Sequence, residues 1–254
     1  MAARNLFLGC YGFVLLVMAM IMPPVAQSQL YHAFSDQRGF LGIPNFLDVV
    51  SNLPFLLIGV AGIIFLRSEK RDGWRNDSTG IRSAYQLVFL STLLVFPGSA
   101  YYHWAPNNDN LLWDRLPIAT GMMALVAAVL LERISIKRPN LLIVALISLG
   151  AVSVLYWYWS ERAQAGNLNF YIAVQFGALL LIALLVRFYP SRYSRARDLY
   201  GVLGWYGLAK LAEMLDQPIY QMSGTVSGHT LKHLLAALGI YWLLRMLRLR
   251  ADKP

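Results

Sequence analysis

Three of the four histidines in the chain have spacings that suit metal binding. His229 and His233 are four residues apart in HTLKH, so on a helix their rings lie on one face, one turn apart. This arrangement suits two ligands of a single metal ion. His103 ends the stretch SAYYH, in which Ser99 precedes it by one helical turn. The fourth, His32, is predicted to be an ordinary loop histidine.

A carboxylate follows this serine and histidine. Asp114 stands eleven residues after His103, just before an apolar run, where it could cap a helix. Each feature alone has a structural explanation, since histidine pairs often hydrogen-bond between helices and serines in apolar helices often bond their own backbone. Ionisable residues in membrane-spanning segments are nevertheless functional candidates by default. The combination therefore predicts a metal site with a carboxylate and a hydroxyl beside it.

The predicted site has a specific chemistry. Three neutral imidazoles with one open position are typical of catalytic zinc. Zinc lowers the pKa of a bound water to about 7. A carboxylate can take that water's proton and pass it to the leaving group, the role predicted for Asp114. Ser99 would donate a hydrogen bond to the oxyanion that forms. The predicted reaction class is metal-assisted hydrolysis of an amide or ester.

The elements that must position these residues are apolar helices. The chain is 57% hydrophobic and only 14% charged, against about 25% charged in soluble domains. Its one cysteine excludes a disulfide framework and a cysteine-based metal site. The sequence predicts an all-α, polytopic membrane helix bundle. Eight helices are expected, over residues 6–24, 46–66, 84–103, 116–131, 140–159, 168–189, 199–215 and 229–248.

The lysines and arginines lie mostly in alternate segments between the predicted helices, as expected for a membrane protein. If the N-terminus is inside, the inner segments hold most of the 22 lysines and arginines. The positive-inside rule then predicts a cytoplasmic C-terminus and places the histidines toward the outer half of the membrane. It also removes the reason to expect a nucleic-acid partner. The inner residues are Arg4, Arg67, Lys70, Arg71, Arg75, Arg82, Arg133, Lys137, Arg138, Arg187, Arg192, Arg195, Arg197, Arg245, Arg248, Arg250 and Lys253; the outer loops hold Arg38, Arg115 and Arg162.

The N-terminal segment has two interpretations. Residues 1–28 have a basic start, an apolar centre and small residues near Ala26 and Ser28, as a signal peptide has. The apolar run is long for a signal peptide, which favours a retained helix. The predicted organisation is therefore an N-terminal hydrophobic helix or signal anchor over 1–28, followed by a seven-helix domain over 29–254.

These motifs resemble those of the alkaline ceramidase family, which belongs to a superfamily of seven-helix membrane hydrolases that also includes adiponectin-receptor-like proteins. The resemblance rests on Ser-x3-His, the aspartate eleven residues later and the late His-x3-His, together with DVVSNLPFLLIG at 48–59. It covers about residues 30–245. It implies a zinc ion held by His103, His229 and His233, with Asp114 and Ser99 beside the reacting water. The implied substrate is ceramide, cleaved at its amide into a fatty acid and a sphingoid base.

The chain departs from the family in two ways. It has an additional N-terminal hydrophobic segment, and it lacks the acidic run that binds calcium before the first core helix in the animal enzymes. Asp36 and Asn45 are only weak calcium ligand candidates, so calcium is not expected. The compact loops suggest a bacterial inner-membrane protein. Since many bacteria make no sphingolipid, the hydrolase chemistry is a firmer expectation than the substrate.

Two alternatives to a ceramidase stay open from the residues themselves. One is a lipid esterase or glycolipid-remodelling hydrolase with the same zinc site. The other is a receptor or transporter with a structural metal, although no internal repeat of the kind found in transporters is evident. For the enzyme, we expect a membrane lipid to enter sideways between helices, with no obligate protein partner.

Further polar residues are expected inside the bundle. Asn45, Asp48 and Asn52 form a stripe on the second helix, where they either orient the histidines or hold helices together. Asp216 follows Lys210 and Glu213 at intervals of three residues on the seventh helix, where a proton relay is one interpretation and a Lys210–Glu213 ion pair the other. Lys232 is predicted to point away from the metal and to pair with Glu213 or Asp216. Residues 156–159, YWYW, are predicted to lie in the interfacial aromatic belt.

Overall fold

The computed structural model describes residues 2–68 and 79–252. Lys70, Arg71, Arg75 and Lys253, which the sequence assigns to inner segments, lie outside the described residues. The helices are α1 (Ala2–Ile21), a 3-10 turn η1 (Gln29–His32), α2 (Phe46–Val50), α3 (Leu53–Ser68), α5 (Ile81–Trp104), α6 (Asn108–Leu131), α7 (Pro139–Arg162), α8 (Asn169–Phe188), α9 (Asp198–Met214), α10 (Asp216–Ser223) and α11 (Gly228–Leu249).

The protein is an all-α, multi-pass membrane bundle. Within the described residues, six helical segments are long and apolar enough to cross a bilayer: Phe46–Ser68, α5, α6, α7, α8 and α11. The helix α9 has 17 residues and is only about 25 Å long, at 1.5 Å per residue, so it falls just short of a full span. In α1 the apolar stretch Phe7–Ile21 is also shorter than a span.

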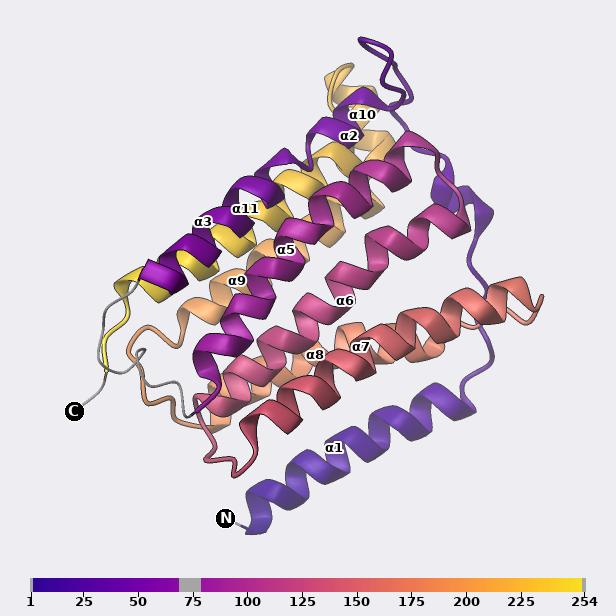
Figure 1. Cartoon of the computed structure of the whole chain (residues 1–254). Coiled ribbons are helices and arrows are strands. Elements are labelled where there is room, and N and C mark those ends of the chain that lie inside the picture. The colour runs from indigo at the N-terminus through magenta and orange to yellow at the C-terminus, as the bar shows by residue number, and fades with distance from the viewer. Residues whose placement is uncertain (1, 69–78, 253–254) are drawn as a thin grey trace.

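The helices run roughly side by side, with α6 in the middle of the bundle (Figure 1). The helices α3, α5, α9 and α11 lie on one side of it and α7 and α8 on the other, while α1 lies at the margin. The helix α1 begins and α11 ends at the same end of the bundle. At the opposite end α5 leads into α6 and α11 begins, which brings the two histidine-bearing segments to one level.

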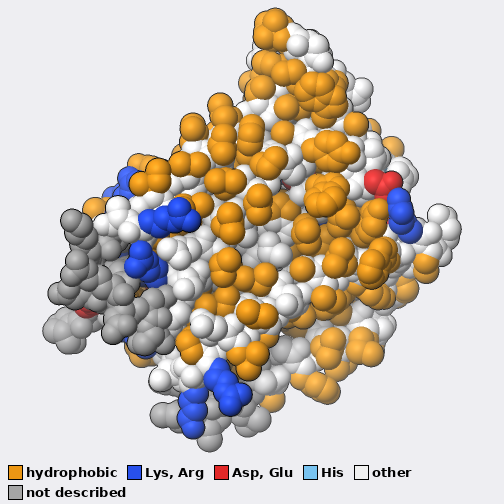
Figure 2. Space-filling view, in the orientation of Figure 1, with side chains coloured by type: hydrophobic (Ala, Val, Ile, Leu, Met, Phe, Trp, Pro, Cys, Tyr) orange, Lys and Arg blue, Asp and Glu red, His pale blue; other side chains and the backbone are white. Residues whose placement is uncertain are grey.

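The core is built around α6. Every side chain from Met123 to Leu131 is buried in one cluster with α5, α8 and α11. Three alanines in this stretch, Ala124, Ala127 and Ala128, allow close helix packing of the kind typical of membrane bundles. Outside the core, hydrophobic side chains cover the visible face, and most of its lysines and arginines lie toward the end where α1 begins and α11 ends (Figure 2). This distribution fits a lipid-facing surface.

The start of α6 differs from the sequence prediction. The helix begins at Asn108 rather than at 116, and its N-cap is Asn107, whose side chain accepts a hydrogen bond from the Asn110 amide. Asp114 is therefore inside α6 and is not its cap, and Arg115 is a buried helical residue rather than an outer-loop one. Polar and charged residues in the first two turns, together with Pro117, conceal this start from a hydropathy pattern.

The second predicted helix is broken. It consists of α2 and α3, separated by Ser51 and Asn52. Pro54 explains the break, because proline has no N–H to donate to the carbonyl four residues earlier and its ring disfavours helical backbone in the preceding residue. The break places Ser51 beside His233.

A buried ionic network lies at the other end of the bundle. Glu132, directly after α6, accepts hydrogen bonds from Tyr85, Arg133 and Arg250. The two arginine side chains and the carboxylate are almost completely buried. Arg250 follows α11, so the network joins the end of α6, the start of α5 and the C-terminal segment.

Candidate metal centre

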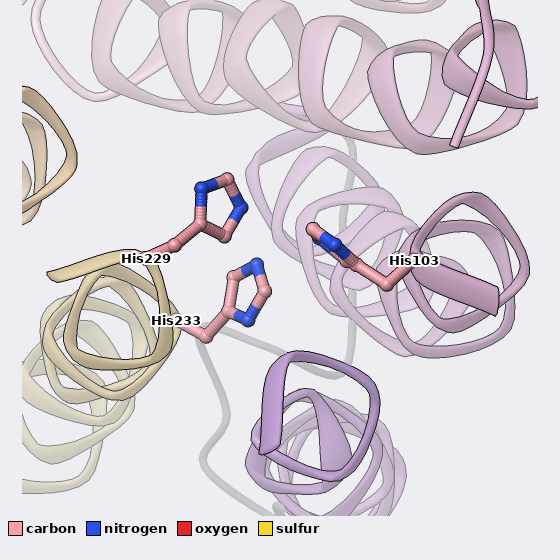
Figure 3. A group of neighbouring side chains, drawn as sticks. All are labelled: His103, His229 and His233. Atoms are coloured by element: carbon pink, nitrogen blue, oxygen red, sulfur yellow. The ribbon is translucent and has the colours of Figure 1, made fainter. Parts of the chain in front are cut away.

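The three predicted ligands come together. His103 is the penultimate residue of α5, and His229 and His233 lie in the first turns of α11. All three are buried, and one ring nitrogen from each can be chosen such that the three lie within 4.8 Å of one another. Figure 3 shows His229 and His233 extending side by side from one helix, with His103 facing them from another. The geometry therefore forms a buried group that could hold a metal ion.

The hydrogen bonding of His103 fits such an ion. Among the described residues neither Nδ1 nor Nε2 of His103 has a hydrogen-bond partner, although both atoms are buried. A buried polar group without a partner costs about 1–3 kcal/mol, so orphaned groups of this kind are uncommon in folded proteins. A metal ion coordinated by one of these nitrogens would remove part of this cost. Three imidazoles match the donor preference of zinc and other transition metals.

A residue that the sequence analysis missed supports His233. The Ser51 Oγ lies 2.7 Å from His233 Nδ1, at the break between α2 and α3. Ligating histidines usually bond a second group through the ring nitrogen that does not bind the metal. The only sequence signal was the position of Ser51 within DVVSNLPFLLIG, next to the predicted polar stripe.

The predicted stripe on the second helix has several separate roles. Asp48 Oδ1 accepts hydrogen bonds from Thr230 Oγ1 at 2.6 Å and Ser227 Oγ at 3.2 Å, and so holds the first turn of α11. Asn45 donates from Nδ2 to the His103 backbone carbonyl at 2.8 Å. None of these hydrogen bonds reaches a histidine ring. Asp48 and Asn45 therefore position the helices that carry the histidines.

Asn52 belongs to a different surface. Its Nδ2 donates to the Asp48 carbonyl at 2.8 Å, while its Oδ1 is buried and has no partner among the described residues. Asn52 also lines the cavity described below. Its unused acceptor is thus available to a ligand in that cavity.

Asp216 holds the start of α11 from another side. Its Oδ1 accepts a hydrogen bond from the His229 backbone amide at 2.7 Å, and its Oδ2 accepts one from the Ser35 amide at 3.0 Å. The carboxylate therefore fixes the backbone of a predicted ligand and leaves the ring untouched. Gly228 is needed for the same contact, because a Cβ there would lie 2.1 Å from the Ala212 carbonyl oxygen.

The two weak calcium ligand candidates, Asp36 and Asn45, each bond a different protein group. Both carboxylate oxygens of Asp36 accept hydrogen bonds from Arg38, at 2.8 Å each. These hydrogen bonds lower the pKa of the Asp36 carboxyl. The Asn45 side chain donates to the His103 backbone carbonyl.

The predicted catalytic pair lies beside the histidines. Ser99 and Asp114 are buried on the neighbouring helices α5 and α6. Together with His233, both line a cavity of about 310 Å³. The cavity follows α5 from Ser99 to Val88, a distance of about 16 Å along the helix. Most of its remaining lining is apolar, so it suits a chain-like hydrophobic ligand.

An ionic cluster adjoins this cavity. Lys232 Nζ lies 2.9 Å from Glu213 Oε1, and Lys210 pairs with the other oxygen of the same carboxylate. The predicted Lys210–Glu213 pair and the pairing of Lys232 with Glu213 are confirmed. The prediction that Lys232 points away from the metal residues is wrong, since its Nζ also lies 3.0 Å from His229 Nε2. The shared turn of α11 brings the two side chains together.

The segment after α1 covers the site. The Phe34 ring is buried, with its centroid 4.6 Å from that of His103 and 4.7 Å from that of His229. His32 Nε2 donates to Asn108 Oδ1, and its Nδ1 accepts from the Tyr102 hydroxyl, each at 2.9 Å. Burial lowers the pKa of His32. His32 is therefore a structural residue that ties the covering segment to α5 and α6.

The aromatic stretch at 156–159 is only partly interfacial. Tyr156 and Trp159 are exposed, as expected for a belt, but Trp157 is completely buried and stacks against Arg115. Successive residues of a helix point in different directions, so Trp157 faces the core while Tyr156 and Trp159 face outward.

No protein-family model matches the chain, and no curated protein matches it. The likeness to alkaline ceramidases therefore rests on the motif residues and their spacing.

Proposed function

We propose that this protein is a zinc-dependent intramembrane hydrolase that cleaves the amide bond of ceramide or a ceramide-like lipid. The products are a fatty acid and a sphingoid base. One observation carries the proposal: three buried histidines converge beside an apolar cavity that is also lined by Ser99 and Asp114. A purely structural metal site would not require a carboxylate and an apolar cavity next to its ligands.

His103, His229 and His233 would hold the metal. When bound there, zinc supplies a Lewis acid that polarises a carbonyl and makes water more acidic. The hydrogen bond from Ser51 and the contacts at the start of α11 keep the imidazoles in place before substrate arrives. Such preorganisation reduces the structural change needed during the reaction.

Asp114 is the proton carrier of the proposed mechanism. Its carboxylate accepts a proton from the water that adds to the amide carbon and delivers a proton to the nitrogen as the C–N bond breaks. Ser99 lines the same cavity as this carboxylate and can donate a hydrogen bond either to it or to the carbonyl oxygen of the substrate. One amide and one water thus give one carboxylic acid and one amine.

The cavity provides the lipid-binding part of the site. Phe55, Val95 and Ile118 are among the apolar residues that would contact an acyl chain. Asn52 Oδ1 would accept a hydrogen bond from the amide N–H or a hydroxyl of the substrate. These contacts would place the scissile amide at the end of the cavity where the histidines lie.

Lateral entry from the bilayer is part of the proposal. Ile172 and Phe176 of α8 line the cavity and are 38% and 47% exposed. A lipid could therefore enter beside α8 while its remaining chain stays in the membrane. The clustering of lysines and arginines at the other end of the bundle supports a cytoplasmic C-terminus, with the site in the outer half of a bacterial inner membrane.

The test uses the full chain purified in non-ionic detergent. We expect about one zinc per chain by elemental analysis, turnover of a fluorescent ceramide, loss of turnover after chelation and recovery on zinc addition. Cleavage of acyl esters without cleavage of amides would replace the amidase by a lipid esterase. A stably bound metal without turnover of either lipid class would contradict the hydrolase and favour a receptor or transporter.

A further inference from the structure

We infer that Arg115 forms a binding site for an anionic group, a phosphate or a carboxylate, in the cavity beside the histidines. The inference rests on the proposed function and narrows its substrate, from neutral ceramide to an acyl-amide lipid with an acidic headgroup. It comes from Arg115 itself, a cation that the proposed hydrolysis does not use.

Arg115 is buried inside the bundle. It lies on α6 next to Asp114, is 7% exposed and lines the cavity. Its guanidinium carbon is 4.2 Å from the centroid of the Trp157 ring, and 4.9 Å from that of Tyr171. Cation–π contacts of this kind stabilise the flat faces of a guanidinium. They do not satisfy its N–H groups, which point outward in the plane of the group.

The in-plane hydrogen bonds of Arg115 are incomplete. Its Nη2 donates to Gln27 Oε1 at 2.6 Å. Its Nη1 is buried and has no hydrogen-bond partner within the described residues. A buried charged donor without an acceptor is unfavourable. An acceptor in the cavity would remove this cost.

The charge balance of the cavity points to the same ligand. Its described lining contains three cations, Arg115, Lys210 and Lys232, but only two carboxylates, Asp114 and Glu213. Glu213 alone pairs with both lysines. One positive charge therefore remains in excess, and a bound divalent metal would increase this excess. An anionic ligand would neutralise it.

The shape of the cavity identifies what carries the anion. Phosphate and carboxylate match the fork of a guanidinium, whose parallel N–H groups can bind two oxygens. The apolar lining beside Arg115 includes Ile118 and Met122, which suit a hydrocarbon chain. The ligand is thus an amphiphile, with its acidic group at Arg115 and its chain in the cavity.

A binding experiment that requires no turnover tests this inference. Chelator-treated protein in non-ionic detergent is titrated with dodecyl phosphate, with dodecanoate and with neutral dodecanol, and ligand binding is followed by thermal shift. The two anionic ligands distinguish a phosphate site from a carboxylate site. We expect at least one of them to bind about tenfold or more tightly than dodecanol, as a charge-assisted hydrogen bond provides.

Variants assign the effect to Arg115. Arg115→Gln should reduce the preference for the anionic ligand about tenfold, and Arg115→Lys should restore part of it. Arg162→Gln is the matched control, because Arg162 is exposed and pairs with Asp109 away from the cavity. Equal binding of all three ligands by the unchanged protein would overturn the inference, even if Arg115→Gln does not fold. A preference that survives in Arg115→Gln would also overturn it.

Turnover separates this inference from the proposed function. Ceramide, ceramide 1-phosphate and an N-acyl amino acid are compared with the zinc-loaded protein, and the kcat/KM ratio of acidic to neutral lipid should exceed about ten. A ratio near one during active hydrolysis would retain the hydrolase and refute the acidic headgroup. If no lipid is cleaved, the proposed function fails, and the binding titration still decides whether Arg115 binds anions.

Discussion

The Ser51 hydroxyl lies 2.7 Å from Nδ1 of His233 and connects the break between α2 and α3 to the helix that carries two of the three histidines. This contact engages one nitrogen of the ring and leaves Nε2 for a metal ion. The break itself follows from Pro54, which prevents α2 and α3 from forming one continuous helix. A local backbone feature of the first core segment therefore orients the ring of His233, a candidate metal ligand 182 residues later.

Ser51→Ala should weaken zinc binding. Loss of the hydroxyl frees the His233 ring to rotate, and removal of such a supporting group typically costs about 10- to 100-fold in metal affinity. Competition with a fluorescent chelator measures the change. Ser68→Ala is the control, since Ser68 donates to the Phe65 carbonyl at an exposed helix end, away from the histidines. Unchanged affinity in Ser51→Ala would mean that Ser51 does not orient the ligand.

His103→Ala should abolish stoichiometric zinc, and so should His229→Ala, because two imidazoles hold the ion poorly. His32→Ala should keep the zinc but lower thermal stability by about 1–2 kcal/mol, since it removes two hydrogen bonds. Elemental analysis and thermal unfolding separate the two effects. Zinc retained in His103→Ala, or lost only in His32→Ala, would show that the ligand assignment is wrong.

Asp114→Asn should keep bound zinc and lower kcat about 10²- to 10⁴-fold, because an amide cannot carry the proton. Asp109→Asn is a matched control on the same helix, where Asp109 forms an exposed pair with Arg162. Its kcat should stay close to that of the unchanged protein. Comparable losses in both variants would indicate a general effect on α6 rather than proton transfer.

Gly98→Ala should separate α5 from α6 at the site. The Trp113 carbonyl oxygen, which Pro117 cannot bond because proline has no N–H, lies where the added Cβ would be, at 2.2 Å. We expect destabilisation of about 1–3 kcal/mol and reduced turnover, since Ser99 and Asp114 stand next to this contact. Gly204→Ala, with nothing within 4 Å of the added Cβ, should instead be neutral or stabilising by up to about 1 kcal/mol. Thermal unfolding and ceramide turnover provide the comparison.

Glu132→Gln should lower the free energy of unfolding by about 3–5 kcal/mol without changing zinc content. The reason is that Arg133 and Arg250 would lose the carboxylate that compensates them in the interior. Asp198→Asn removes the more exposed pair with Arg195 and should cost less than about 1 kcal/mol. A loss of zinc in Glu132→Gln would show that the two ends of the bundle are coupled.

Much of the architecture could be predicted from the sequence. Spanning-length apolar runs are a local property, because backbone groups in a bilayer must bond within their own segment. The His-x3-His spacing placed two side chains on one helix face for a similar local reason. The grouping of His103 with them required only that the two helix ends lie at one membrane level. These predictions are confirmed by the bundle and by the buried histidine group.

The tertiary structure decided which groups support the site. Ser51 on His233, Lys232 near His229 and Arg115 against Trp157 all depend on how neighbouring helices rotate about their axes. Rotation is set by packing between residues far apart in sequence, so hydropathy and spacing do not reveal it. The start of α6 was hidden for a related reason, since its polar first turns are buried only because other helices cover them. The sequence by itself determined the fold class and the three histidines that come together, and tertiary packing determined the cavity and its charges.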